Sequence, residues 1–592
     1  MTSAGLRPTL LAVAGLTLFL SACGGGRPYQ GTQAQQITGG AALVNPASSR
    51  PAVRASRQMV ATAHPLATRA ALDILRRGGS AIDAAIAAQM VLTMVEPQSS
   101  GIGGGAFLLH FNAKDGKIEA YDGREWSPAS AKPGMFLGSD GKPRPFSQAR
   151  PGGLSVGVPG VLRMLELAHK DHGKLPWEDL FINGIEVAEK GFTITPRLAK
   201  AIDETGDFNG LSAGGYYRNS DGKPKAAGAL LTNPELANTF RTVAKGGADA
   251  FYKGPIAQAM IDAVGKAPTN PAVWTVDDLA SYKAVKREPV CLFYRVYVVC
   301  GMPPPSSGGI ATLQILGLLQ KFELDKMTAG SSQAVHLVAE ASRIAFADRN
   351  TYIADPDFVP VPAGGMLDPG YLALRAGEIS TTRSMGKAEP GMPGIASLPL
   401  PPADDHMGSI STSQLAIVDA EGNAVTLTSS VEGTFGSRLM AKGFVLNNQL
   451  TDFSFEPEIM GAAVANRVEA HKRPRSSMSP TIVLDGSGKL VMAVGSPGGT
   501  QIIGYVAKTL ISALDWKMDM QQAISYPIFL NRNGTTELEE GTALARLKPA
   551  LEALGHTVEV KSFDSGVQGI FITPTGLTGG ADPRREGVAQ GD

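Results

Sequence analysis

The spacing of apolar positions divides the chain into a helix-rich part and a later part built from β-hairpins. HPLATRAALDILRRGG has Pro65 near its start and Gly78-Gly79 at its end, which predicts a helix between them. In SAIDAAIAAQMVLTMV, Ser80 and Asp83 are spaced like a capping box, and the apolar residues run all round, so we expect a buried helix. Helical runs then alternate with loops from about residue 160 to 380.

The stretch STSQLAIVDAEGNAVTLTSS predicts a β-hairpin, because two β-rich runs flank DAEGN, which has turn chemistry. With the loop centred on Glu421, Val418 pairs with Ala424. Continuing that register places Thr412 opposite Ser430, so two hydroxyl groups meet at the open end of the hairpin.

A second hairpin is predicted in SSMSPTIVLDGSGKLVMAVGSPGGT, where Thr481 would pair with Ala493. Extending this pairing brings tandem hydroxyls beside a glycine pair, namely Ser476, Ser477, Gly498 and Gly499. Exposed backbone N–H groups there would suit a carboxylate or a developing oxyanion. The alternative for both hairpins is plain structural β with polar ends.

The glycine run 101–105 is followed by a β-rich segment, AFLLHF, whereas a dinucleotide-binding loop opens a helix. AFLLHFNAKDGKIEAYDGREWSP therefore predicts another hairpin, with Arg124 just past its second strand. Sheets with flanking helices indicate an α+β or layered α/β class.

The composition excludes some classes of function but does not identify the activity. The chain has 592 residues, 43% apolar and 18% charged, which is typical of globular enzymes and predicts two domains or two intimately shared halves. Lys+Arg and Asp+Glu are both 54, so no basic surplus indicates nucleic acid. Without CxxC or HExxH the sequence gives no support for a metal site.

The N-terminus has the features of a targeting segment. LLAVAGLTLFL is an apolar region too short to span a bilayer comfortably, and it ends in Leu-Ser-Ala-Cys, which resembles a bacterial lipobox. We therefore expect a signal peptide at 1–22, a lipidated Cys23, and a flexible Gly/Gln/Ser/Pro-rich tether over 23–52. The alternative is an ordinary signal peptide with a chance cysteine.

The other two cysteines lie in REPVCLFYRVYVVCG. A two-residue turn at 295–296 would pair Tyr294 with Tyr297 and bring Cys291 opposite Cys300, at a distance that permits a disulfide. The alternative is two buried thiols.

Seven motifs together resemble the γ-glutamyltranspeptidase family. They are PQSSGIGGG, MPPPSSGG, STSQLAIVDAEGNAVTLTSS, NNQLTDF, KRPRSSMSPTIV, GSPGG and GGADPRREG, in one collinear order from about residue 53 to the C-terminus. The resemblance implies a four-layer αββα sandwich of the N-terminal nucleophile hydrolase type, made by a precursor that cuts itself. The matching cut lies between Ser411 and Thr412, after an exposed-looking Pro/Gly-rich segment at 384–408. It yields a heterodimer of a large chain, 53–411, and a small catalytic chain, 412–592.

Cutting matters because an internal threonine has no base beside its hydroxyl group. Once Thr412 is N-terminal, its α-amine, with a pKa near 7.7–8.0, takes the hydroxyl proton at neutral pH. The resemblance implies a γ-glutamyl ester on Thr412, formed from glutathione or related compounds. The acyl group then passes to water or to an amino acid or peptide. No cofactor is implied.

The family's site residues carry over by position. The implied ligands of the substrate α-carboxylate are Arg124, Ser476 and Ser477. Those of the α-ammonium are Asp452, Gln449 and Glu432. Gly498 and Gly499 match the oxyanion hole, and Ser430 hydrogen-bonds the nucleophile. Each has a structural alternative: Arg124 as a surface ion pair with Glu125 or Asp122, Asp452 and Gln449 as turn caps, and the glycines as a tight turn.

Some positions depart from the family pattern. Gln414 stands where many members carry His, Glu432 where others have Asn, and Ser430 where others have Thr. The segment between Asp452 and Ser476 is shorter than the lid of long-lid members and has no Tyr, which leaves the balance of hydrolysis against transpeptidation open. The rival hypotheses are an acylase of the same architecture acting on glutaryl side chains, and a non-catalytic envelope lipoprotein.

The lipobox interpretation is tested by changing Cys23→Ser. Without the thiol no lipid can be attached, so the variant is expected in the soluble fraction while the wild type stays with the membranes. Fractionation after a high-salt wash, followed by immunoblotting, measures this. A variant that remains membrane-bound after the wash contradicts the lipid anchor.

Overall fold

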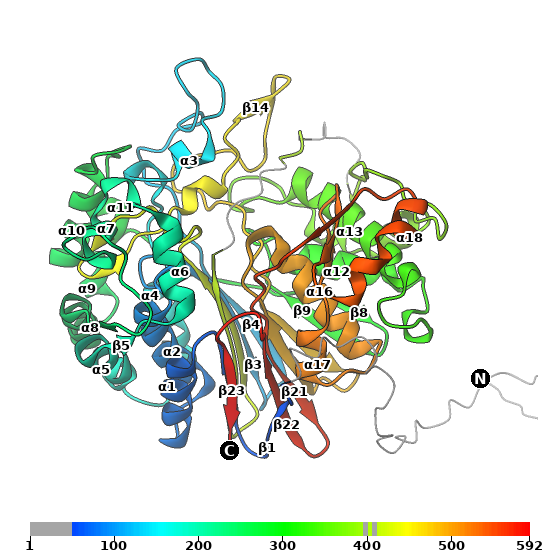
Figure 1. The fold of residues 1–592 in the computed structure, drawn as a ribbon, viewed down its shortest axis with the longest axis horizontal. Helices are drawn as coiled ribbons and strands as arrows, with labels where there is room; N and C mark the ends of the chain where they lie inside the picture. Colours follow the sequence, from blue (N-terminus) through cyan, green and yellow to red (C-terminus); the bar gives the residue numbers. More distant parts are fainter. Residues whose placement is uncertain (1–49, 395–400, 405–410) are drawn as a thin grey trace, which may run out of the picture. The chain divides into compact units, whose positions relative to one another are not determined.

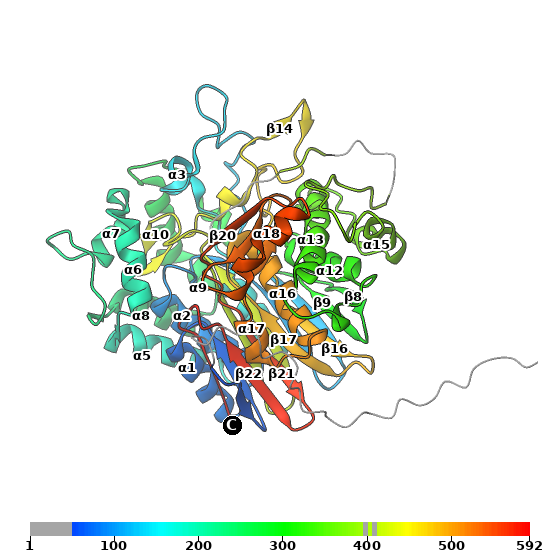
Figure 2. The ribbon, with the colours of Figure 1, turned by 45° about the vertical axis from the view of Figure 1, so that its right-hand side comes forward.

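Two seven-stranded β-sheets pack against each other, and helices cover both outer faces (Figures 1 and 2). The computed structural model describes residues 50–394, 401–404 and 411–592. The predicted signal peptide, Cys23 and the tether as far as residue 49 lie outside the described residues. Among the helices that are described, none combines the length and apolarity needed to cross a bilayer.

The first sheet is antiparallel and holds the predicted catalytic hairpin at its centre. Its order is β23 (Val588–Gly591), β2 (Met59–Thr62), β10 (Ser413–Val418), β11 (Ala424–Ser430), β3 (Gly105–Asn112), β4 (Lys117–Gly123) and β7 (Val285–Arg287). Val418 pairs with Ala424 and Gln414 with Thr428, so the predicted register of this hairpin is confirmed. The predicted β3–β4 hairpin is also present, and Arg124 directly follows β4.

The second sheet contains the other predicted hairpin. Its order is β1 (Val53–Ala55), β22 (Gly576–Ala581), β21 (Gln568–Thr573), β17 (Leu490–Gly495), β16 (Thr481–Asp485), β9 (Tyr297–Gly301) and β8 (Val290–Tyr294). The predicted pairing of Thr481 with Ala493 is wrong, because Thr481 lies opposite Val494. Leu484 still pairs with Leu490, and a bulge at Val491 shifts the register by one residue beyond it.

Helices α1 (Pro65–Arg76), α2 (Ala81–Val95) and α4 (Val161–His172) cover the first sheet. Helices α12 (Gly308–Leu319), α13 (Ser332–Tyr352), α16 (Ile502–Leu514) and α17 (Met520–Ser525) form the layer over the second sheet (Figure 1). The predicted capping box of Ser80 and Asp83 is present, and every residue of α2 is buried. Both predictions for this segment are confirmed.

The remaining elements are shorter or lie farther from the sheets. The helices are α3 (Phe146–Ala149), α5 (Ile182–Lys190), α6 (Pro196–Thr205), α7 (Ser212–Tyr217), α8 (Pro234–Gly246), α9 (Asp249–Tyr252), α10 (Gly254–Gly265), α11 (Val276–Ala280), α14 (Ala363–Met366), α15 (Pro369–Ala376) and α18 (Lys548–Ala553). The small sheets pair β5 (Phe192–Thr193) with β6 (Leu230–Leu231), β12 (Met440–Ala441) with β13 (Phe444–Val445), and β14 (Glu458–Ile459) with β15 (Ala462–Ala463), and join β18 (Phe529–Asn531), β19 (Thr536–Glu539) and β20 (Val558–Lys561).

Strand β10 is buried on both faces, which explains its nearly continuous apolar sequence. Leu415 and Ile417 belong to the core beneath α1 and α2, whereas Ala416 and Val418 belong to the core between the two sheets. Successive side chains of a strand point to opposite faces, so one strand serves both cores. The expected four-layer αββα sandwich of the α+β class is confirmed.

Both sheets mix strands from before and after residue 411. In the first sheet the β10–β11 hairpin is inserted between β2 and β3, and in the second sheet β1, β8 and β9 flank four later strands. The described residues, from Arg50 to Asp592, belong to one compact unit. Of the two alternatives predicted from chain length, the structure has two intimately shared halves.

The segment predicted to be exposed, 384–408, is exposed only in part. Ser384, Ala388 and Asp404 are buried, and the Asp404 carboxylate lies 3.0 Å from the Arg475 guanidinium. Residues 395–400 and 405–410 lie outside the described residues. The expectation of continuous exposure is wrong at these buried positions, because they hold the segment against the body of the protein.

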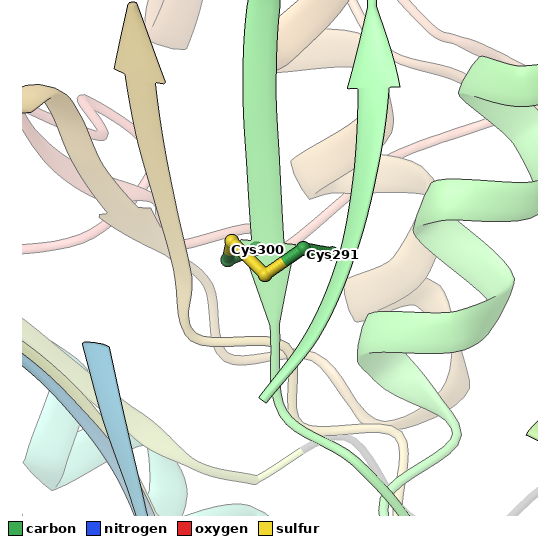
Figure 3. Close-up of a disulfide and its surroundings, with 2 residues drawn as sticks. All are labelled: Cys291 and Cys300. Atoms are coloured by element: carbon green, nitrogen blue, oxygen red, sulfur yellow. A yellow bond between two sulfur atoms is a disulfide. The ribbon is translucent and has the colours of Figure 1, made fainter. Parts of the chain in front are cut away.

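Cys291 and Cys300 form a disulfide between neighbouring strands β8 and β9 (Figure 3). Tyr294 pairs with Tyr297, as the two-residue turn requires, and the cysteine Cα atoms are 4.1 Å apart. Arg295 in the turn has a positive φ of 58°, a backbone conformation that residues other than glycine seldom adopt. The bridge fastens the edge strand β8 to the sheet.

Candidate active site

Thr412 lies immediately before β10 at the buried end of the first sheet. Its Oγ1 contacts the carbonyl oxygen of Ser411 and lies 3.2 Å from Ser430 Oγ, as the hairpin register predicted. Ser430 Oγ donates to the same Ser411 carbonyl at 2.8 Å. Two hydroxyl groups thus converge on the carbonyl of the peptide bond that joins Ser411 to Thr412.

The orientation of the Ser430 hydroxyl follows from its other partner. Its oxygen accepts a hydrogen bond from the backbone N–H of Glu432 at 2.9 Å, so its single proton is directed to the Ser411 carbonyl. On the other side of the peptide bond, Arg585 Nη1 donates to the Thr412 carbonyl at 2.9 Å. The backbone on both sides of the predicted cleavage site is therefore held in place.

A cavity beside Thr412 brings together most of the residues predicted from the sequence. Its walls include Ser411, Thr412, Ser430, Arg124, Glu432, Gln449, Asp452, Ser476, Ser477 and Gly499. Arg124 and Ser411 precede the predicted cut and the others follow it, so the site needs both parts of the chain.

Arg124 is fully buried and its partner is distant in sequence. Its Nη2 donates to Asp452 Oδ2 at 2.6 Å, and its Nε and Nη2 also donate to the carbonyls of Pro474 and Arg475. The alternative of a surface ion pair with Glu125 or Asp122 is wrong, because the Arg124 side chain is only 1% exposed and its short contact is with Asp452. A positive and a negative group thus lie side by side at the cavity wall.

Glu125 lies behind this pair and is also fully buried. Its nearer oxygen is 3.7 Å from Arg124 Nη1, and neither carboxylate oxygen has a hydrogen-bond partner among the described residues. Burial raises the pKa of Glu125 to about 8, so this carboxyl is neutral at pH 7. Among the described carboxylates, that of Asp452 makes the shortest contact with Arg124, at 2.6 Å.

Acceptor oxygens line the wall next to Asp452. Gln449 Nε2 donates to Asp452 Oδ2 at 2.8 Å, which turns Gln449 Oε1 into a buried acceptor without a partner among the described side chains. Glu432 Oε2 accepts from Asn448 Nδ2. Asp452, Glu432 and Gln449 together form the kind of wall that an ammonium group needs.

The serine pair lies beside basic side chains of the cavity wall, including that of Arg349. Arg349 Nη2 donates to Ser477 Oγ at 2.8 Å and its Nε donates to Ser307 Oγ at 2.9 Å. The backbone N–H of Met478 donates to Ser476 Oγ at 3.1 Å, which leaves that hydroxyl free to donate. Hydroxyl donors backed by a buried guanidinium suit a carboxylate.

The glycine pair forms a turn that only glycine tolerates. Gly498 and Gly499 have φ of 134° and 58°, and a Cβ on Gly498 would lie 2.6 Å from the Tyr505 ring. Gly499 lines the cavity, and Gly498 is its immediate neighbour in the chain. The predicted meeting of this turn with Ser476 and Ser477 is therefore found, in spite of the register error in β16–β17.

The residues at the site that were missed from the sequence include Arg349, Arg475, Arg585 and Asn448. Arg585 and Asn448 lie inside the quoted motifs GGADPRREG and NNQLTDF, so the signal was present without a role attached to it. Arg349 lies in a helical run, ADRN, that gives no local signal. Only its place on the buried face of α13 brings it to the cavity.

The segment after Asp452 forms a small hairpin, β14–β15, at the top of Figure 1. Met460 at its tip is fully exposed and has a positive φ of 53°. This hairpin supplies no residue to the cavity wall. The segment between Asp452 and Ser476, which is shorter than the lid of long-lid members, therefore contains a projecting hairpin.

An αββα sandwich with a threonine directly before a central strand, its hydroxyl beside the preceding carbonyl, is the arrangement of the N-terminal nucleophile hydrolases. This is the class that the fold and site define.

Comparison with known proteins narrows the class. The sequence profile of Gamma-glutamyltranspeptidase matches residues 67–592. A glutathione hydrolase proenzyme of Bacillus subtilis (strain 168) is 38% identical over 546 residues, covering 90% of this chain and 91% of that protein. A glutathione hydrolase proenzyme of Escherichia coli (strain K12) is 36% identical over 547 residues, covering 90% and 91%. A crystal structure of cephalosporin acylase from Bacillus halodurans matches with a TM-score of 0.82 and 27% identity, covering 92% of this chain and 97% of that one. The chain belongs to the gamma-glutamyltranspeptidase family, which confirms the resemblance seen in its motifs.

The contact of Ser430 with the Ser411 carbonyl predicts a role in self-cleavage. Changing Ser430→Ala removes a donor aimed at the oxygen that becomes negatively charged, so cleavage is expected to slow on the order of 10²-fold. The decay of the intact chain is followed by SDS gel and intact mass. Ser429→Ala is the matched control, since Ser429 Oγ is buried without a partner among the described residues. Equal rates in the two variants contradict the role.

Proposed function

We propose that the chain is a self-processing γ-glutamyl hydrolase and transferase that acts on glutathione and related γ-glutamyl compounds through Thr412. The observation that carries this proposal is the Thr412 hydroxyl, held between Ser430 and the Ser411 carbonyl at the wall of a cavity. The opposed charges of Arg124 and Asp452 in that cavity suit the zwitterionic end of a γ-glutamyl group.

Processing is the first proposed step. Thr412 Oγ1 attacks the Ser411 carbonyl carbon, and the charge that develops on the carbonyl oxygen is stabilised by the Ser430 hydroxyl. The C–N bond then breaks, and the proton of the Thr412 hydroxyl group passes to the departing nitrogen. The Ser411 acyl group is thereby transferred to the Thr412 oxygen as an ester, and the α-amine is released. Water hydrolyses the ester and leaves the proposed chains 53–411 and 412–592 as a heterodimer.

Turnover uses the same hydroxyl group. The new α-amine of Thr412 takes the hydroxyl proton, and the oxygen attacks the γ-amide carbonyl of the substrate. The oxyanion is bound by the backbone N–H groups of Gly498 and Gly499. For glutathione, cysteinylglycine leaves with a proton, and the γ-glutamyl ester passes to water or to the amine of an amino acid or peptide. No step needs a cofactor.

Substrate recognition follows from the two sides of the cavity. The α-carboxylate would bind Arg124, Ser476 and Ser477, which supply a guanidinium and two hydroxyl donors. The α-ammonium would bind Asp452, Glu432 and Gln449 Oε1. Because Arg124 and Asp452 are adjacent, a bound zwitterion replaces their mutual contact with two matched contacts.

We further propose that the protein is exported and membrane-anchored, in the periplasm or at the cell surface. The supporting features are the signal-like residues 1–22, Cys23 in a lipobox-like sequence, and the Gly-rich stretch that follows. The disulfide between Cys291 and Cys300 fits an oxidising compartment.

An acylase acting on glutaryl side chains is the second candidate, and the similarity to a cephalosporin acylase structure favours it. A glutaryl group has the carboxylate of a γ-glutamyl group but lacks the ammonium. The acidic wall of Asp452, Glu432 and Gln449 would then have nothing to bind. We therefore place γ-glutamyl substrates first.

The nucleophile is tested by Thr412→Ala beside Thr412→Ser. The alanine variant is expected to stay whole and inert, because it lacks the attacking oxygen. The serine variant keeps a hydroxyl group and is expected to cut itself. Intact mass, N-terminal sequencing and assays with a γ-glutamyl anilide and glutathione measure both properties. A wild type that stays uncut, or an uncut variant that works equally well, contradicts the mechanism.

The substrate class is tested by Asp452→Asn. Losing one charged partner of the ammonium is expected to lower kcat/KM for a γ-glutamyl anilide by about 10- to 100-fold. Turnover of a glutaryl anilide should change little, since it has no ammonium. The wild type should also prefer the γ-glutamyl compound. A glutaryl preference in the wild type, or equal losses on both substrates, favours the acylase.

A further inference from the structure

A second cluster of reactive side chains lies away from the cavity, between the first sheet and the C-terminal end of α4. It consists of His110 on β3, Glu119 on β4 and His172, the last residue of α4. His110 is five residues along β3 from Gly105, which pairs with Ser430. At about 3.3 Å per residue the cluster is roughly 17 Å from the active-site end of the strand.

The sheet itself brings two of the three side chains together. His110 lies directly opposite Glu119 in the β3–β4 register, so their side chains share one face. His110 Nδ1 is 3.8 Å from Glu119 Oε2, and His172 Nε2 contacts the same oxygen. The three potential ligand atoms all lie within 4.8 Å of one another.

His110 Nδ1 is the atom of this cluster whose hydrogen-bonding capacity is unsatisfied. The His110 side chain is 4% exposed, and its Nδ1 has no hydrogen-bond partner among the described residues. The neutral imidazole of a histidine is the form that binds a metal ion. A buried ring nitrogen left unpaired is costly unless something occupies the space before it.

The described cluster of His336, Glu340 and His556 shows the contrast. There His336 contacts the Ser380 carbonyl and His556, and Glu340 accepts from three donors. His556 Nδ1 is bonded to Thr536 Oγ1. Every ring nitrogen and carboxylate oxygen of this second cluster already has a partner, so it is a hydrogen-bond network. The His110 cluster differs because it contains the unpaired His110 Nδ1 beside the hydrogen bond between His172 Nε2 and Glu119 Oε2.

The side chains around His110 carry charges of both signs, and this environment is compatible with a bound cation. Lys286 Nζ donates to Glu119 Oε1 at 2.6 Å and to Asp171 Oδ2 at 3.0 Å, and Tyr121 donates to Asp171 at 2.8 Å. Lys286 is 42% exposed, so its ammonium can move into solvent. The C-terminal end of α4 adds the negative end of a helix dipole.

We propose that His110, Glu119 and His172 bind a divalent transition-metal ion of the Zn²⁺ type, which ties the end of α4 to strands β3 and β4. Two imidazoles and one carboxylate are a common zinc donor set that leaves a position for water. Donor atoms around tetrahedral zinc are about 3.4 Å apart at the usual bond lengths. His110 Nδ1 and Glu119 Oε2, which are 3.8 Å apart, would move slightly closer, and the hydrogen bond between His172 Nε2 and the same oxygen would be replaced by bonds to the ion. Lys286 donates to the other oxygen of Glu119, Oε1, where its positive charge opposes the binding of a cation.

The test uses the tag-free protein, stripped with a chelator and dialysed against Zn²⁺. Bound zinc is measured by mass spectrometry of the element, and affinity by competition with a zinc indicator. The wild type is expected to hold about one ion more than His172→Gln and Glu119→Gln, whose affinity should fall on the order of tenfold or more. The matched control is His169→Gln on the same helix, where the His169 ring contacts the Leu175 carbonyl, and it should bind like the wild type.

Lys286→Met supplies a test that does not depend on removing a ligand. Losing the competing ammonium should tighten zinc binding, and thermal unfolding in Zn²⁺ should show a larger upward shift in Tm than in the wild type. Wild-type binding no greater than that of His172→Gln, or unchanged affinity in Lys286→Met, overturns the proposal. Self-cleavage can be measured independently of zinc binding, because none of these residues lines the cavity beside Thr412.

Discussion

The pairing of β10 on both of its edges is the constraint on which the site depends. One edge pairs with β11 and the other with β2, and both faces of the strand are buried. A strand fixed in this way cannot slip by one residue without turning every side chain to the wrong core. Thr412 directly precedes this fixed strand, so the position of the strand determines where the Thr412 hydroxyl group lies.

The charged side chains of the cavity wall are held in place by contacts within the protein. Arg124 is fixed by two backbone carbonyls as well as by Asp452, and Arg349 is fixed by Ser307 and Ser477. Groups that are already oriented need little rearrangement when a substrate binds. Burial raises the pKa of Glu125, and a neutral carboxyl group beside Arg124 would leave the guanidinium available to another anion.

The sequence predicted what depends on local pattern. The capped buried helix follows from its capping residues and its apolar pattern, and the hairpin that brings Thr412 to Ser430 and the facing cysteines follow from counting residues outward from a turn. The error in β16–β17 arose from a bulge, and the run LVMAV has no polar alternation that could reveal the extra residue. The motifs then supplied the cleavage site and the candidate ligands by family resemblance.

What counting could not reach is contact between distant segments. Asp452 as the partner of Arg124, and Arg349 in the cavity, depend on how helices and sheets stack. The cluster of His110 and Glu119 also escaped, since the two lie on neighbouring strands and match no short metal-binding motif. Such sites become visible only when register and layer order are known together.

The interleaving of strands has a consequence for a cell that carries two different defective alleles. If the chain is cut between Ser411 and Thr412, the β10–β11 hairpin still lies between β2 and β3 with its backbone hydrogen bonds intact. Neither fragment can leave without dismantling both sheets. A cell that carries two defective alleles, one altered before the cut and one after it, would gain nothing from mixing their products. After such a cut, the two fragments of one precursor would stay together in the same molecule.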